Sequence, residues 1–142
     1  MSKNPVIHFE MGYFDGDRMK NFYETAFGWN LQQMGAEMGN YIVAQTAETD
    51  ENGMVKTPGT INGGFYQKIE DPLSHAPSVV ISVPDIKAAM QAVEANGGKI
   101  LGAMTETGEA SMEPMMIPGV GHWISFQDTE NNRVSLLQPA GM

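Results

Sequence analysis

The sequence predicts an α+β fold, in which two tandem βαβββ modules form a curved, mixed and mostly antiparallel sheet with the helices on the outside. Three observations lead to this prediction. The length of 142 residues suits one domain. A helical pattern occurs twice at an offset of 70 residues, and in both copies one strand-like run precedes the helix and three follow it.

The first helix is predicted over residues 15–28. Its apolar residues recur at the spacing of one helix face, namely Met19, Phe22, Tyr23, Ala26 and Phe27. Asp15 is suited to cap the helix N-terminus and Gly28 to end it. We therefore expect Phe22, Tyr23 and Phe27 to be buried.

The second helix is predicted over residues 85–98. Ile86, Ala89, Met90 and Val93 again have helical spacing, Asp85 takes the capping position, and two glycines at 97 and 98 follow. Both the caps and the end points lie 70 residues from their counterparts in the first helix. We expect Met90 and Val93 to be buried.

Strand-like runs complete both modules. The first module has them at 5–13, 30–34, 41–46 and 61–68, and the second at 78–83, 99–104, 122–127 and 133–138. Residues 47–59 and 106–121 are predicted to be loops. The resulting prediction is a single domain over 1–142, with modules 5–68 and 76–139 joined by a linker at 70–77.

Composition excludes several classes of function. Eight Lys and Arg against 17 Asp and Glu give a net charge of −9, and the basic residues do not cluster, so nucleic acid and anionic membranes are not expected partners. The absence of cysteine excludes disulfides, thiolate nucleophiles and Cys-based metal sites. Without a long apolar run at the N-terminus, the expected location is the cytoplasm.

Three segments carry a resemblance to a known family. They are Val6-Ile7-His8-Phe9-Glu10, Asn21-Phe22-Tyr23 with Phe27-Gly28-Trp29, and Asp128-Thr129-Glu130-Asn131-Asn132-Arg133. Together with the paired modules, they resemble the vicinal oxygen chelate superfamily, which includes glyoxalase I, bleomycin-resistance proteins, methylmalonyl-CoA epimerase and extradiol dioxygenases. Further pieces, such as Ile61-Asn62-Gly63-Gly64, are similar to its lactoylglutathione-lyase-related subgroup. The resemblance covers residues 5 to 139 and implies the same fold.

The resemblance also implies where a divalent metal would bind, since the family's enzymes take ligands from the first and last strands of each module. The residues there are His8, Ser78, Ser135, and Gly64 or Phe65. Only His8 is a competent ligand, so we expect no cofactor. The alternative is a zinc, nickel, magnesium, manganese or iron ion that also uses Glu10 and His122.

Catalytic residues are expected in the first strand. His8 and Glu10 are two residues apart, so both side chains lie on one strand face and the pair could relay a proton. The alternatives are an internal histidine bonded to a neighbour and a static ion pair. The glycines at 63 and 64 precede no helix, so close backbone approach explains them better than phosphate binding.

The ligand-binding residues are expected to be Ser78, His122, Trp123, Arg133 and Ser135. Ser78 is the repeat counterpart of His8, and Trp123 is a candidate groove wall. Serine hydroxyls bind transition metals poorly but hydrogen-bond well. The groove is therefore expected to take a small polar organic molecule.

Two classes of function stay open on the sequence, and whether the chain is an enzyme is undecided between them. The first is a lyase or isomerase of the lactoylglutathione-lyase type, moving a proton next to a carbonyl with a metal or with His8 and Glu10. The second is a binding protein like the bleomycin-resistance proteins, and a scaffold with a silent groove is a third possibility. The incomplete metal set argues against a true glyoxalase I. The resemblance further implies a homodimer.

Overall fold

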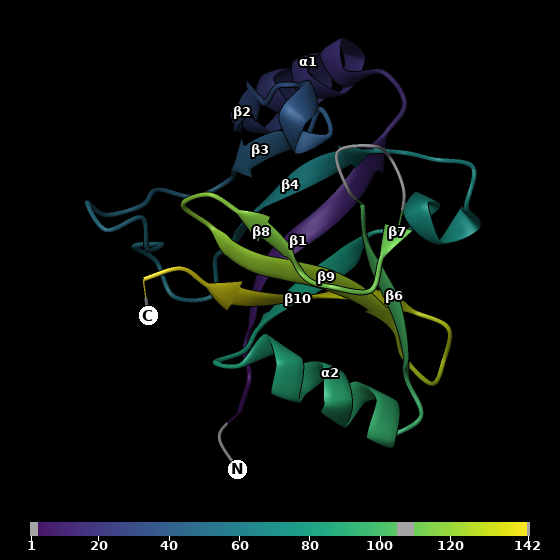
Figure 1. The fold of residues 1–142 in the computed structure, drawn as a ribbon. Coiled ribbons are helices and arrows are strands. Elements are labelled where there is room, and N and C mark those ends of the chain that lie inside the picture. Colours follow the sequence, from purple (N-terminus) through teal and green to yellow (C-terminus); the bar gives the residue numbers. More distant parts are fainter. Residues whose placement is uncertain (1–2, 105–109, 142) are drawn as a thin grey trace. The chain divides into compact units, whose positions relative to one another are not determined.

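The computed structural model describes residues 3–104 and 110–141, and the chain divides into two compact units (Figure 1). The N-terminal unit is His8–Pro77, and the C-terminal unit is Ser78–Met142 together with Met1–Ile7. The amide of Ser82 donates to the carbonyl of Pro5 at 2.8 Å, which ties the start of the chain to the second unit. The sequence pattern instead assigns this start to the first module.

The N-terminal unit contains β1 (Val6–Tyr13) from His8 onward, together with α1 (Gly16–Phe27), β2 (Asn30–Gln33), β3 (Ile42–Gln45), β4 (Asn62–Gln67) and the short 3-10 helices η1 (Ala36–Met38) and η2 (Pro72–His75). Its strands follow the order β2-β3-β4-β1. Strand β1 is parallel to β4, while the β2–β3 and β3–β4 pairs are antiparallel. The predicted βαβββ order is confirmed.

Helix α1 begins and ends where the sequence predicts. The Asp15 carboxylate accepts a hydrogen bond from the amide of Arg18, and Gly28 ends the helix in a left-handed conformation with φ of 73°. Met19 and Tyr23, four residues apart, pack on a core of Tyr13, Ile42, Ala44 and Phe65. Tyr23 also stacks on Trp29, with ring centroids 4.6 Å apart.

The prediction that Phe22 and Phe27 are buried was wrong. They are 56% and 62% exposed, and their ring centroids lie 6.2 Å apart. The physical reason is that the sheet contacts a narrower stripe of the helix than the apolar spacing suggests. Met19 and Tyr23 fill that contact, and Tyr23 itself is only half-buried.

The C-terminal unit contains β5 (Ser78–Ser82), α2 (Ile86–Ala95), β6 (Lys99–Met104), β7 (Ala110–Ser111), β8 (Met115–Ile117), β9 (Gly121–Gln127) and β10 (Arg133–Pro139). Its strand order is β5-β10-β9-β6-β7, and β8 also pairs with β9. Only the β5–β10 pair is parallel among these pairings. The predicted loop 106–121 therefore contains two short strands, and residues 105–109 lie outside the described part of the chain.

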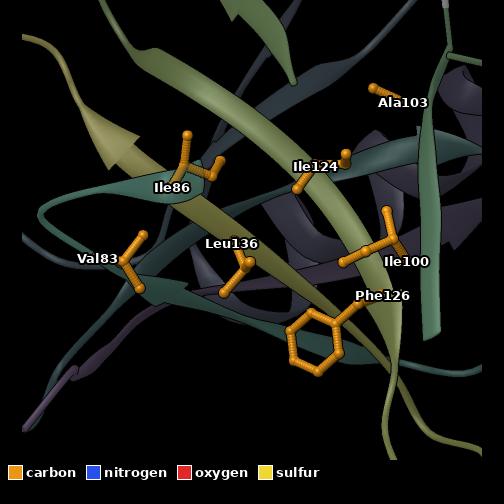
Figure 2. Close-up of a cluster of buried hydrophobic side chains, with 7 residues drawn as sticks. All are labelled: Val83, Ile86, Ile100, Ala103, Ile124, Phe126 and Leu136. Carbon is orange, nitrogen blue, oxygen red and sulfur yellow. The ribbon is translucent and has the colours of Figure 1, made fainter. Parts of the chain in front are cut away.

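Helix α2 covers one face of the C-terminal sheet and shares its core. The carboxylate of Asp85 caps the helix by accepting from the amide of Ala88. Figure 2 shows the buried cluster, which consists of Val83, Ile86, Ile100, Ala103, Ile124, Phe126 and Leu136. Met90 and Val93 are half-buried and pack against it. Among the described residues, no helix is long and apolar enough to cross a membrane.

Candidate functional site

Glu10 is a carboxylate placed inside the N-terminal unit by strand alternation. Phe9 and Met11, its neighbours along β1, pack on the apolar core beneath α1. Glu10 therefore lies on the opposite face of β1, the same face as His8. The residue is only 5% exposed, although an ionised carboxylate loses solvation energy on burial. Such a group needs polar partners within the protein.

Tyr41 is one of these partners. Its hydroxyl donates to Oε2 of Glu10 at 3.0 Å across 31 positions of sequence. The ring of Tyr41 lies over Gly64, which is paired with Glu10 in the β1–β4 register. A Cβ atom on Gly64 would overlap both the ring and the hydroxyl of Tyr41. Close backbone approach at Gly64 is predictable from the sequence, but the role of Tyr41 is not, because nothing in the local pattern marks it as a partner of β1.

His8 is half-buried, and its Nδ1 lies 3.2 Å from the carbonyl oxygen of Asn62, its register partner on β4. A carbonyl only accepts hydrogen bonds, so this contact favours the tautomer with the proton on Nδ1. In the neutral ring, Nε2 then carries the lone pair. The Asn62 side chain meanwhile holds the start of the loop between β3 and β4, because its Oδ1 accepts from the amides of Thr46 and Ala47.

In the C-terminal unit, four of the five predicted ligand residues share one sheet face. Ser135 pairs with Val80 and Ser125, Arg133 pairs with Gln127, and alternation adds Ser78 and Trp123 to that face. The guanidinium of Arg133 lies 5.8 Å from the Trp123 ring centroid, close enough for a cation–π contact. Ser135 is fully buried.

His122 lies apart from this group. It precedes Trp123 in β9, so alternation turns its side chain to the opposite face of the sheet. Its register partners are Gln138 on β10 and Met116 on β8. The structure therefore does not place His122 with Ser135 and Trp123.

The two units can be compared position by position, because the internal repeat is visible in their registers. Glu10 pairs with Gly64 in the first unit, and Val80 pairs with Ser135 at the equivalent place in the second. Tyr41 and Trp123 are also equivalent, since each precedes the isoleucine that pairs with the last strand. Trp123 Nε1 is buried without a hydrogen-bond acceptor among the described residues. The side chain of Val80, the counterpart of Glu10, contains no acceptor.

The donors for a metal ion are few. No cluster of three or more His, Cys, Asp or Glu side chains that could hold an ion occurs within residues 3–104 and 110–141. At the positions that the resemblance implies, Gly64 has no side chain and Ser135 offers a hydroxyl. His8 and Glu10 are thus short of the about three ligands that retain a divalent ion. This donor set does not fit the family's metal, so we derive no step through one.

The segment Asp128–Arg133, part of the family resemblance, builds the turn between β9 and β10. The Asp128 carboxylate accepts from the amides of Glu130 and Asn132 and from the side chain of Asn132. These hydrogen bonds, led by those of Asn132, hold the pKa of Asp128 below its ordinary value of 3.8. Asn131 adopts φ of 67°. The motif therefore shapes a turn and also supplies Arg133 to the polar face.

Two surface hollows also occur in the N-terminal unit. One, of about 490 Å³, follows the end of α1 and the β2 edge and is lined by Glu24, Gly28, Trp29, Asn30, Leu31, Gln32, Val43 and Gln45. The other, of about 330 Å³, is lined by residues that include Phe9 and Met11. Neither contains a predicted site residue, and Glu24, the one ionisable group among both linings, is exposed. We place the candidate site at Glu10, where a carboxylate is buried.

Comparisons with known proteins agree with this architecture. A family model described as Glyoxalase/Bleomycin resistance protein/Dioxygenase superfamily matches residues 6–136. A glyoxylase-like domain-containing protein of Didymella fabae is 32% identical over 120 residues, which cover 83% of this chain and 80% of that protein.

Among solved structures, a methylmalonyl-CoA epimerase in complex with methylmalonyl-CoA and NH4+ has a TM-score of 0.66 at 15% identity, covering 99% of this chain and 97% of its own. A hypothetical protein from Bacillus halodurans C-125 has a TM-score of 0.64 at 12% identity, with coverages of 99% and 98%. These structures share the fold. This chain belongs to the Glyoxalase/Bleomycin resistance protein/Dioxygenase superfamily, also called the vicinal oxygen chelate superfamily.

Proposed function

We propose that this chain binds a small polar organic molecule and that the Glu10 carboxylate accepts a proton from a carbon next to a carbonyl of that molecule, without a resident metal. The observation that carries the proposal is the identity of residue 10. Glu10 is 5% exposed, and Val80 at the equivalent position of the second unit is 3% exposed. The fold thus accepts an apolar residue at this position, so the carboxylate needs an explanation other than packing.

The chemistry follows from general acid–base catalysis. Glu10 would take the proton as the C–H bond breaks, and the electron pair would move toward the carbonyl oxygen to give an enolate. Return of the proton to the same or the opposite side would give exchange or isomerisation. His8 lies on the same face of β1 with its Nδ1 beside the Asn62 carbonyl, so we assign it the role of a second proton carrier.

Ser78, Trp123, Arg133 and Ser135 are proposed separately, as ligand-binding residues of the polar face of the C-terminal unit. Hydroxyl groups and a guanidinium can hydrogen-bond the oxygens of a polar molecule, and an indole provides an apolar surface. His122, also predicted to bind the ligand, lies on the opposite face of β9 and is not grouped with these four residues. A relation to the solved epimerases, one of them in complex with methylmalonyl-CoA, makes acyl thioesters a sensible first class to test.

The test is hydrogen exchange at carbon. Purified protein is incubated in D2O with methylmalonyl-CoA and, separately, with pyruvate, and deuterium uptake next to the carbonyl is followed by mass spectrometry. We expect uptake with at least one class of probe, and its loss in Glu10→Gln. The matched control is Glu24→Gln, which changes an exposed glutamate of the same unit and should retain uptake. Equal uptake by Glu10→Gln and the wild type would refute the role of Glu10.

The alternative is a metal-dependent lyase or isomerase that uses His8 and Glu10. Elemental analysis separates it from the main proposal, which expects far less than one equivalent of any transition metal per chain after purification without added ions. About one equivalent, lost in His8→Ala, would establish the alternative. If the probes bind in a thermal-shift assay and no deuterium enters, the chain is a binding protein.

A further inference from the structure

The contact between Tyr41 and Glu10 is held in place from both sides. Glu10 lies in the middle of β1, which is paired with β4 from His8 to Tyr13. Tyr41 extends the β2–β3 pairing by one step, because its carbonyl accepts from the amide of Met34 at 2.8 Å. The donor and the acceptor are thus both carried by paired sheet backbone.

The turn before Tyr41 has further anchors. The carbonyl of Asn40 accepts from the Tyr13 hydroxyl at 2.6 Å and from the Gln33 side chain at 2.9 Å. Asn40 itself has φ of 58°, a left-handed conformation that asparagine tolerates. These contacts fix the direction in which the chain enters Tyr41, and so limit where its ring can lie.

Gly64 makes room for this ring. A side chain at position 64 would occupy the volume of the Tyr41 hydroxyl and of two ring carbons, Cε1 and Cζ. The conformation of Gly64 is not a left-handed one, so the residue is needed for space rather than for backbone freedom. In the second unit, Ser135 takes this position, and neither the tyrosine nor the carboxylate is present there.

We infer that Tyr41 is a positioning residue, whose hydroxyl holds the Glu10 carboxylate in one orientation through Oε2, and that Gly64 is the residue that permits this contact. The three residues form one arrangement of the first unit, and all three are replaced in the second. Since the same fold forms there without them, the arrangement serves Glu10 and not the packing of the sheet. The inference depends on the proposed function only in taking Glu10 to be the base.

Positioning of this kind matters because a general base removes a proton efficiently only when its carboxylate oxygen is aimed at the C–H bond. A carboxylate with free rotation about its last side-chain bonds spends little time aimed at the carbon acid, whereas a held carboxylate begins in the reactive arrangement. The bond to Oε2 determines the plane of the carboxylate and with it the direction of Oε1.

The experiment measures the Glu10 carboxyl directly, with no ligand present. Protein labelled with ¹³C at the glutamate side-chain carboxyl is examined by NMR at one fixed pH, and the Glu10 signal is the one that is missing from Glu10→Gln. In Tyr41→Phe, which keeps the ring and removes the donor, we expect the Glu10 carboxyl signal to move away from its wild-type chemical shift, because the hydrogen bond to Oε2 is lost. Gly64→Ala should move it in the same direction, because the added methyl displaces the hydroxyl.

Tyr23→Phe is the matched control. It also removes one hydroxyl from a half-buried tyrosine of the N-terminal unit, but Tyr23 packs beneath α1 on the other side of the sheet. The Glu10 carboxyl signal of Tyr23→Phe should keep its wild-type chemical shift. If the signal moves no further in Tyr41→Phe than in Tyr23→Phe, the inference is overturned, whether or not Gly64→Ala folds.

The result is independent of the test of the proposed function. If the Glu10 carboxyl signal moves in Tyr41→Phe and Glu10→Gln still exchanges deuterium, the positioning contact stands and the proposed role of Glu10 falls. If the signal does not move and Glu10→Gln loses exchange, Glu10 acts as the base and Tyr41 does not position it.

Discussion

Removal of the Tyr41–Glu10 hydrogen bond should have a measurable and non-additive effect on stability. The contact is 3.0 Å long and its acceptor is 5% exposed, so it belongs to the class of buried bonds to ionisable groups. Such bonds contribute about 1.5–3 kcal/mol, and an unmatched buried group costs a similar amount. We expect Tyr41→Phe to lower the free energy of unfolding by about 1–3 kcal/mol.

The partner substitution is Glu10→Val, which gives the first unit the residue that the second unit has at Val80. Valine gains apolar burial but leaves the Tyr41 hydroxyl without this acceptor, so the single variant should lose about 1–2 kcal/mol. In the double variant both halves of the bond are gone. Its loss should therefore be smaller than the sum of the two single losses, by about 1–2 kcal/mol.

Urea unfolding followed by tryptophan fluorescence provides the four free energies, provided that the dependence on urea concentration is the same in all of them. The combination of Tyr41→Phe with Tyr23→Phe serves as a control pair and should be additive, because Tyr23 lies on the α1 side of the sheet. Additivity of Tyr41→Phe and Glu10→Val within about 0.5 kcal/mol would refute an energetic coupling between the two side chains.

Three further predictions concern the rest of the chain. Ile124→Ala, at a fully buried site, should lower the free energy of unfolding by about 2–5 kcal/mol. Phe22→Ala, at a site 56% exposed, should lower it by less than about 1 kcal/mol. Equal losses in urea unfolding would contradict the assigned core. The hydrogen bonds that lower the pKa of Asp128 stabilise the folded state above pH 3.8, and this stabilisation is lost as the pH falls below that value. Asp128→Ala should therefore make the stability depend less on pH in the acid part of an unfolding titration. An unchanged dependence would show that the turn does not respond to this charge. Light scattering should give twice the chain mass of 15.5 kDa if the homodimer implied by the resemblance forms, and a value of one chain mass at micromolar concentration would exclude it.

The sequence alone determined the parts of this protein that depend on neighbouring residues. Spacing and backbone chemistry predict the 70-residue repeat, the helix caps at Asp15 and Asp85, and the end of the first helix at the left-handed Gly28. The structure reproduces these features within a few residues. Strand alternation also assigns His8 and Glu10 to one face, because side chains two positions apart in a strand point the same way. Local periodicity carries these features because each involves contacts over a few positions only.

The tertiary structure alone decided which apolar residues are covered and which polar residues meet. The spacing of α1 marks Phe22 and Tyr23 alike as apolar, but only the width of the contact with the sheet separates the exposed ring from the packed one. Strand β8, at three residues, is too short to have a pattern and exists through its pairing with β9. Glu10, Tyr41 and Gly64 meet only because the β1–β4 and β3–β4 registers bring them together. Register is a property of paired strands, and no periodicity within a single strand specifies it.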